Sequence, residues 1–183
     1  GYPVMIKASA GGGGKGLRVA FNDKEAFEGF TSCRNEARNS FGDDRVFIEK
    51  FVEGTELAIS VINEGAGPIA LPAVEIEPTS GRFGYDERIT AGETNYYVPA
   101  RVDQSVLERA AKVAIKAHEE LGLRHLSRID LIVDAAGVPW FLEANVAPGL
   151  TEISLLPQAI VATGTGLPQV YLGLAEAAKL GRG

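Results

Sequence analysis

The chain has 183 residues, of which 45% are hydrophobic and 23% charged, and its formal net charge is −6. This composition predicts a globular protein with a sizeable core, and the negative charge argues against a surface for nucleic acid or for an anionic membrane. The sequence shows no transmembrane run and no signal peptide, and its one cysteine, Cys33, excludes an intramolecular disulfide framework. We therefore expect a cytoplasmic protein. Because the chain starts at Gly1 without a methionine, we also expect a fragment of a longer protein.

The first 50 residues alternate between strand and helix signals. Apolar, β-branched stretches predict strands at residues 3–8, 17–21 and 46–50. Asn22 and Glu25 have the spacing of a capping box, which predicts a helix that runs to about Ser40 and ends at Gly42. Cys33 lies within this helical pattern, and we expect it to pack in the core.

Further strand signals follow in the rest of the chain. They predict strands at residues 56–62 and 69–77, a long loop over 79–95, and a β-hairpin formed by 128–134 and 140–145. Because strands of this kind alternate with helices and pair as hairpins, the sequence predicts an α+β fold.

Helical patterns also recur in this second part. Asp103 opens an amphipathic helix that ends at Gly122. Its apolar face comprises Val106, Ala110, Val113, Ala114, Ala117 and Leu121. Two further helices are expected at 154–162 and 168–180. His118 and His125 lie on or just past the first of these helices, and we expect both at the surface.

Oxygen-bearing side chains gather in the predicted hairpin. Side chains alternate between the two faces of a strand, so Glu143 and Asn145 share a face, and Asp130 on the partner strand can face them. Two carboxylates and an amide are costly together unless something pairs with them, and Mg²⁺ prefers such oxygen ligands. The alternative is a structural network of salt bridges with Arg128 and Lys7.

A glycine-rich loop lies between the first two predicted strands. Residues 10–16 read AGGGGKG, and Gly11, Gly13 and Gly16 fit the letters of a dinucleotide-binding motif, but a strand follows where that motif needs a helix. A Walker A motif also fails, because Lys15 is followed by glycine. A strand–loop–strand arrangement favours a flap over a nucleotide phosphate, and the alternative is a plain hairpin tip.

Two other features point to a nucleotide. Lys7 lies in an otherwise apolar strand, where a phosphate would supply its anion, unless the side chain simply reaches to water. Glu49 and Glu56 flank the end of a strand, where they can accept hydrogen bonds from an adenine amino group and from ribose hydroxyls. The alternative is an acidic strand end that is only solvated.

With these stretches, the chain resembles the ATP-grasp ligases. Residues 1–50 resemble biotin carboxylase, notably in YPVMIKASA (2–10), the glycine loop and SFGDDR (40–45). From Gly54 on, the chain resembles D-alanine–D-alanine ligase in LPAVEI (71–76), TNYYVPA (94–100), LSRID (126–130), EAN (143–145) and PGLT (148–151). The resemblance implies two α+β subdomains, 1–53 with the flap and 54–183 with the metal and phosphate site, that clasp the nucleotide. It also implies that the N-terminal lobe for the first substrate is absent from these residues.

The resemblance implies a role for each matching residue. ATP would be bound by Lys7, by the backbone of Gly11, Gly12, Gly13 and Gly14, by Glu49 and Val52 at adenine, by Glu56 at ribose, and also by Lys50, Phe51 and Leu142. Mg²⁺, with Mn²⁺ as the alternative ion, would be held by Asp130, Glu143 and Asn145. The catalytic residues would be Arg128, Arg88 and Lys7. The carboxylate of the second amino acid would be received by Gly149, Ser154 and Leu155.

The chain departs from these families at several positions. Arg88 stands where the ligases have a loop lysine, Ile89 follows where they have a tyrosine, and four glycines replace a loop that bears serine. VAPG (146–149) stands where the carboxylases have arginine and histidine for bicarbonate and biotin. These departures affect the substrate more than the use of ATP.

The resulting hypothesis is an ATP- and Mg²⁺-dependent carboxylate–amine ligase that works through an acyl phosphate and forms a C–N bond. Its substrates would be a small carboxylate and a small amine, and the family implies a homodimer. Two alternatives stay open: ATP-dependent activation of bicarbonate, as in biotin carboxylase, and a nucleotide-binding fragment without activity of its own.

Overall fold

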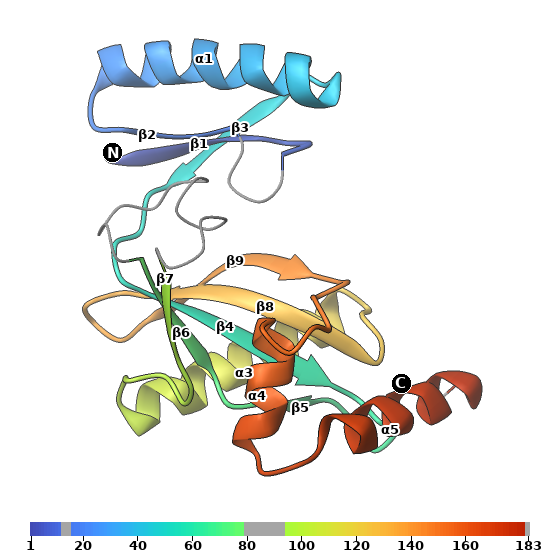
Figure 1. The fold of residues 1–183 in the computed structure, drawn as a ribbon. Helices are drawn as coiled ribbons and strands as arrows, with labels where there is room; N and C mark the ends of the chain where they lie inside the picture. Colours follow the sequence, from blue (N-terminus) through green and yellow to red (C-terminus); the bar gives the residue numbers. More distant parts are fainter. Residues whose placement is uncertain (12–15, 79–93, 182–183) are drawn as a thin grey trace. The chain divides into compact units, whose positions relative to one another are not determined.

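A computed structural model describes three stretches of the chain: residues 1–11, 16–78 and 94–181. The chain divides into two compact units (Figure 1). The first unit comprises Gly1–Val52 and Pro78–Asn95, and the second comprises Glu53–Glu77 and Tyr96–Gly183. Helices and antiparallel strands together confirm the predicted α+β fold class. Among the described residues, no helix is both long and apolar enough to cross a bilayer.

In its described residues, the first unit has a three-stranded antiparallel sheet and one helix. The strands are β1 (Val4–Ala8), β2 (Leu17–Ala20) and β3 (Val46–Lys50), in the order β2-β1-β3, and the helix is α1 (Asp23–Phe41). The predicted strands and helix are therefore confirmed. The unit's buried core comprises Ile6, Ala8, Ala20, Cys33 and Ala37.

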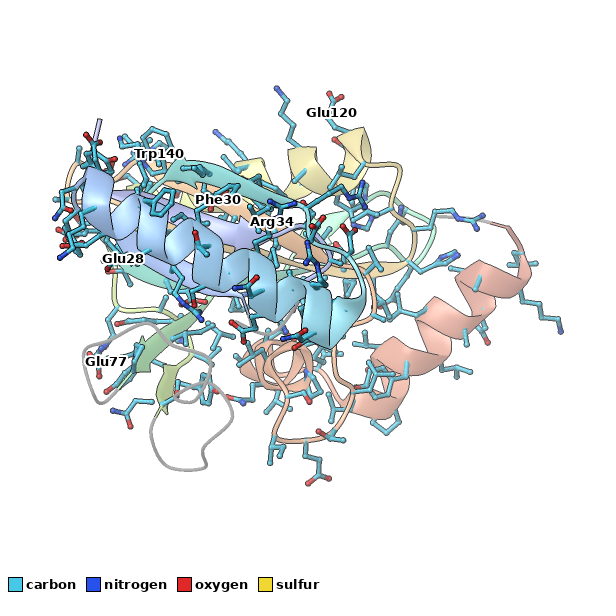
Figure 2. All side chains as sticks on the ribbon, turned by 90° about the horizontal axis from the view of Figure 1, so that it is seen from above. Glu28, Phe30, Arg34, Glu77, Glu120 and Trp140 are labelled. Atoms are coloured by element: carbon cyan, nitrogen blue, oxygen red, sulfur yellow. The ribbon has the colours of Figure 1, made fainter. Side chains whose placement is uncertain are left out.

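The ends of α1 are fixed as the sequence predicts. The side-chain oxygen of Asn22 accepts from the backbone N–H of Glu25 at 3.0 Å, and the Glu25 carboxylate accepts from the backbone N–H of Phe21 at 2.9 Å. At the other end Gly42 has φ +70° and donates to the carbonyl of Arg38. Cys33 is fully buried, as expected, whereas side chains such as Glu28, Phe30 and Arg34 extend from the helix (Figure 2).

The second unit is built on a six-stranded sheet in the order β7-β6-β4-β8-β9, with β5 also paired to β4. In chain order the strands are β4 (Thr55–Ile62), β5 (Ile69–Ala70), β6 (Val74–Pro78), β7 (Thr94–Tyr97), β8 (Leu126–Val133) and β9 (Pro139–Asn145). Strand β4 pairs antiparallel with β5, β6 and β8, and β8 pairs antiparallel with β9, which confirms the predicted hairpin.

Two expectations about the strands are wrong. Residues 69–77 form two strands rather than one, because Pro72 lies between them and has no N–H to donate to a ladder. Strand β7 begins at Thr94, inside the stretch expected to be a loop, since its β-prone residues pair with β6. The rest of that expected loop, 79–93, lies outside the described residues.

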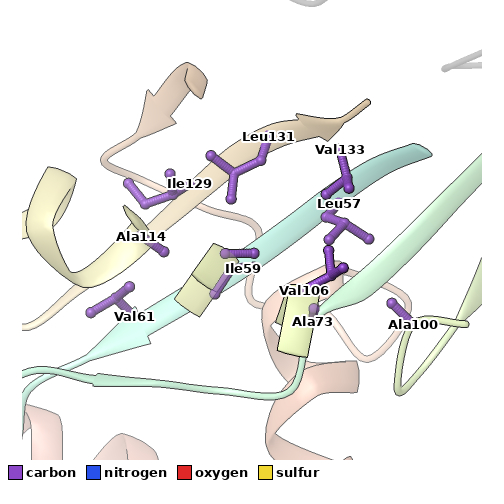
Figure 3. Close-up of a cluster of buried hydrophobic side chains, with 11 residues drawn as sticks. Leu57, Ile59, Val61, Ala73, Ala100, Val106, Ala114, Ile129, Leu131 and Val133 are labelled. Atoms are coloured by element: carbon purple, nitrogen blue, oxygen red, sulfur yellow. The ribbon is translucent and has the colours of Figure 1, made fainter. Parts of the chain in front are cut away.

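Each face of this sheet has its own apolar core. On one face, helix α3 (Gln104–Glu120) packs against alternate residues of β4 and β8 (Figure 3). That cluster includes Leu57, Ile59, Val61, Ile129, Leu131, Val133, Val106, Ala110 and Ala114. The opposite face packs against α4 (Leu155–Ala162) and α5 (Leu167–Lys179), through a cluster that includes Ala58, Ile62, Val74, Leu156, Ile160, Val170 and Leu174.

Helix α3 corrects the prediction for His118. Its buried stripe continues by steps of four from Val106 to His118, and His118 is 2% exposed, whereas Leu121 beyond the helix end is 55% exposed. The His118 Nδ1 atom lies 2.8 Å from the hydroxyl of the buried Ser127 on β8. This hydrogen bond satisfies one ring nitrogen, whereas Nε2 is buried without a partner among the described residues. His125 is half-buried rather than exposed.

Candidate functional site

The β8–β9 hairpin brings four polar residues to one face of the large sheet. Asp130 lies directly opposite Glu143, and Arg128 directly opposite Asn145. Residues opposite one another in an antiparallel pair point to the same side, so all four share a face. On the neighbouring strand, Ala58 lies opposite Asp130, and Ala58 belongs to the core on the side away from α3. The polar group therefore extends the face that α4 and α5 cover elsewhere.

Arg128 and Asp130 form a two-pronged ion pair. Arg128 Nε donates to Asp130 Oδ1 and Arg128 Nη2 donates to Asp130 Oδ2, both at 2.8 Å. The Asp130 residue is 2% exposed. Burial by itself would lower the pKa of Arg128, but the hydrogen bonds to Asp130 and the charges of Asp130, Glu143 and Glu56 outweigh it, and the pKa is raised. The guanidinium thus stays charged and fixed in direction.

The two other members of this group are accessible. Glu143 is exposed, and Asn145 is half-buried with its side-chain oxygen accepting from the backbone N–H of Ala147 at 3.0 Å. The register shifts between Asp130 and Leu131, so Leu142 is an extra residue in β9, and such a bulge re-aims the neighbouring side chains.

The group's fit to a metal ion follows from its chemistry. Among residues 1–11, 16–78 and 94–181, no cluster of three or more histidine, cysteine, aspartate or glutamate side chains is placed to hold a metal. Asp130, Glu143 and Asn145 instead offer two carboxylates and one amide oxygen on a single face. These are the oxygen donors that Mg²⁺ takes, and the ion also binds through one or two carboxylates. The donor set therefore fits Mg²⁺, with Arg128 as the present partner of Asp130.

Glu56 lies on β4, two residues before Ala58, and points to the same face. It is 2% exposed and lies opposite Ile132 of β8. Its charge contributes to the raised pKa of Arg128. The structure thus brings Glu56 into the electrostatic surroundings of Arg128, which the sequence alone did not predict.

In the first unit, Lys7 and Glu49 form an ion pair between β1 and β3. The side chains are 19% and 36% exposed, respectively. The lysine in this otherwise apolar strand thus has a carboxylate partner within the first unit. Both side chains remain reachable from solvent.

The end of β3 lines a hollow of about 540 Å³. Its walls include the predicted nucleotide-binding residues Glu49, Lys50 and Phe51, and the Phe51 backbone N–H donates to the Pro3 carbonyl at 3.2 Å. The next predicted residue, Val52, is half-buried. Of the glycine loop, Gly11 is exposed and donates to the carbonyl of Ala8. Gly12, Gly13, Gly14 and Arg88 lie outside the described residues.

Gly149, Ser154 and Leu155 come together where α4 begins. Ser154 is the N-cap residue and Leu155 the first helical residue. A Cβ atom on Gly149 would lie 2.5 Å from Ser154 Oγ, so any other residue there would force the Ser154 side chain to shift. Thr151 belongs to the same turn, with its hydroxyl 2.8 Å from that of Ser154. Sequence reasoning did not assign Thr151 a role, although the three-residue spacing of the two hydroxyls was a usable signal.

The two antiparallel α+β units, with a glycine loop in one and an arginine–carboxylate group on the sheet of the other, define a protein of the ATP-grasp class. The chain matches the family described as "D-ala D-ala ligase C-terminus" over residues 1–175, and it belongs to that family.

Individual relatives agree with this assignment. The chain is 35% identical over 178 residues to a D-alanine–D-alanine ligase from Magnetococcus marinus. The aligned region covers 97% of this chain and 54% of the relative. The chain thus spans about half the length of the curated relatives it matches.

Two solved structures share the fold. A D-alanine–D-alanine ligase from Bacillus anthracis superposes with a TM-score of 0.78 at 24% identity, over 100% of this chain and 55% of that one. The second is the biotin carboxylase domain of a 2-oxoglutarate carboxylase from Hydrogenobacter thermophilus, solved with MgADP and bicarbonate. It superposes with a TM-score of 0.70 at 25% identity, over 97% of this chain and 37% of that one. The resemblance to both groups is therefore confirmed.

Proposed function

We propose that the protein is an ATP-dependent ligase that joins two D-alanine molecules through an acyl phosphate. The observation that carries this proposal is the 35% identity to a D-alanine–D-alanine ligase over 97% of the chain. The polar face around Arg128 supports it, because it combines a fixed cation with oxygen donors for a metal.

The nucleotide would be held mainly by the first unit, with residues 1–53 as the small subdomain and 54–183 as the large one. Lys7 would exchange Glu49 for the phosphates, and the glycine loop would donate its backbone N–H groups to them. Adenine would bind near Glu49, Lys50 and Phe51, which line the hollow at the end of β3, and Glu56 would accept from the ribose.

Asp130, Glu143 and Asn145 would hold Mg²⁺, which, when bound, offsets the negative charge of the β and γ phosphates. Two nitrogen atoms of the Arg128 guanidinium, Nε and Nη2, already donate to Asp130, so the side chain is preorganised before substrate arrives. Its remaining N–H donors, two on Nη1 and one on Nη2, would stabilise the oxyanion that develops at the acyl group.

The acceptor would bind at the start of α4. Its carboxylate would accept from the Ser154 hydroxyl and from the backbone N–H groups of the first helical turn, which carry no side-chain cap. The amine of the acceptor then attacks the acyl phosphate, the new C–N bond forms and inorganic phosphate leaves. Positioning and electrostatics suffice, because no step needs a protein nucleophile.

The test is phosphate release from ATP with D-alanine, L-alanine or bicarbonate, using the polypeptide as its gene encodes it. We expect D-alanine to stimulate release. Glu143→Gln should raise the Mg²⁺ concentration needed for half-maximal rate by about tenfold or more, since even residues that only support metal ligands cost about 10- to 100-fold. Glu120→Gln, which removes an exposed glutamate of α3 (Figure 2), is the matched control and should change neither quantity.

A second candidate is ATP-dependent activation of bicarbonate. The similarity to a biotin carboxylase domain solved with bicarbonate favours it. Stimulation by bicarbonate alone, with none by either alanine, would establish this function in place of the ligase. Stimulation by D-alanine alone excludes it.

A further inference from the structure

The turn before α4 contains Ser154, whose hydroxyl does not cap the helix. A serine at an N-cap position normally accepts a hydrogen bond from the backbone N–H of the second or third helical residue. Ser154 has the extended backbone of such a cap, but its side chain makes no capping bond. The third helical residue is Pro157, which has no N–H to donate, so only the N–H of Leu156 could serve. Ser154 does not accept from it, and its hydroxyl has a different partner.

That partner is Thr151. The two hydroxyl oxygens lie 2.8 Å apart, and the Ser154 backbone N–H also donates to the Thr151 carbonyl at 2.7 Å. On the other side, Gly149 approaches so closely that a Cβ there would lie 2.5 Å from Ser154 Oγ. The side chain of Ser154 is thus enclosed between Gly149 and Thr151, both in the same turn.

Hydrogen-bond direction decides what this pair can do. Each hydroxyl has one proton to donate, and a carboxylate can only accept. If Ser154 donates to Thr151, its proton is spent within the turn. If Thr151 donates to Ser154, the Ser154 proton is left for an anion. The hydrogen bond that Ser154 then donates to the anion is strengthened, because the bond from Thr151 polarises the Ser154 hydroxyl.

We propose that Thr151 is a positioning residue for the acceptor substrate: it donates to Ser154 Oγ and so directs the Ser154 proton to the acceptor's carboxylate. This inference rests on the proposed ligase function, in which Ser154 receives that carboxylate. Thr151 itself does not touch the reacting atoms. It acts through Ser154 alone, and this separates it from a residue that merely shapes the turn.

The experiment is a double-variant cycle in the polypeptide as its gene encodes it, with steady-state kinetics for ATP, donor and acceptor D-alanine. Thr151→Val keeps the shape and removes the hydroxyl, and because Thr151 is exposed the fold should tolerate it. We expect the acceptor KM to rise about three- to tenfold, the effect of one hydrogen bond, with the KM for ATP unchanged. Thr151→Ser should restore the wild-type value. In a Ser154→Ala background, Thr151→Val should have no further effect.

The outcomes separate this inference from the function on which it rests. If Ser154→Ala raises the acceptor KM but Thr151→Val does not, or if the two effects multiply in the double variant, the role of Thr151 is refuted while the ligase function stands. If wild-type protein shows no turnover that depends on D-alanine, the proposed function is refuted, and this inference with it. Thr31→Val, which removes an exposed hydroxyl on α1, is the matched control and should leave every constant unchanged.

Discussion

At the scale of single residues, the Arg128–Asp130 pair has the greatest consequence for stability. The Asp130 carboxylate is buried, and both of its oxygens accept from one guanidinium. Removing the arginine would leave a buried charge without its partner, which typically costs about 3–5 kcal/mol, whereas replacing both partners by apolar residues is often neutral.

We therefore predict that Arg128→Met lowers the free energy of unfolding by about 3 kcal/mol, and that Arg128→Met with Asp130→Leu recovers most of the loss. Urea unfolding followed by circular dichroism measures both. Arg34→Met, which breaks an exposed ion pair with Asp44, is the control and should cost less than about 1 kcal/mol. A double variant no more stable than Arg128→Met would contradict the account.

The same pair shows what single residues can and cannot reveal in advance. The alternation of side chains along a strand is enough to place Asp130, Glu143 and Asn145 on one face. It does not choose the partner of Asp130, because a metal ion and Arg128 both satisfy a carboxylate. Likewise the spacing of Lys7 indicates a need for an anion, but only the pairing of β1 with β3 brings Glu49 to it.

At the scale of elements, predictions succeed where the signal is local. Both ends of α1 follow from side chains within a few residues, and so does the β8–β9 hairpin. The prediction for His118 fails because its reason is distant in sequence: the stripe of α3 meets Ser127 on β8, and this contact satisfies one nitrogen of the buried imidazole. Helical spacing places His118 on the same stripe as the buried alanines, but spacing alone does not show whether a histidine at such a position is buried.

The buried His118 makes the α3–β8 contact sensitive to acid. Burial lowers the pKa of His118 below its usual 6.5, and the charge of Glu119 offsets this only in part. The unfolded chain therefore binds a proton more readily than the folded one, so the stability is complete above about pH 6.5 and falls as the pH drops below it. Carboxylates paired with arginine, such as Asp43 with a pKa of about 2, titrate below this window.

We predict that the free energy of unfolding decreases between pH 7 and pH 5 with a slope from this group of at most about 1.4 kcal/mol per pH unit. His118→Leu combined with Ser127→Ala removes the titrating ring and its hydroxyl partner together, and should flatten the profile over this range. Urea unfolding at closely spaced pH values gives both curves. Identical slopes in the two proteins would show that His118 does not titrate on unfolding.

At the scale of the whole molecule, the two units differ in the size of their cores. Among the described residues, the first buries a cluster of five small or medium apolar side chains around α1, whereas the second has two larger clusters on the two faces of one sheet. Because stability rises with the apolar surface removed from water, the first unit should open locally at lower free energy. This difference in local stability between the two units follows from the burial of particular residues, and it cannot be predicted from composition alone.

The expected difference in local stability between the two units can be measured. In hydrogen exchange followed by mass spectrometry, amides of β1 and α1 should exchange well before those of β4 and β8, which pair along their whole length in the larger core. Mg²⁺ with ATP at about 100 times its Kd should then slow exchange in the first unit by up to about 100-fold, the effect of about 2.7 kcal/mol of binding to the folded state. ATP with a chelator in place of Mg²⁺ is the control and should protect less. Equal exchange in both units, or protection by Mg²⁺ and ATP confined to α4 and α5, would show that the first unit is neither the weaker one nor the place where the nucleotide binds.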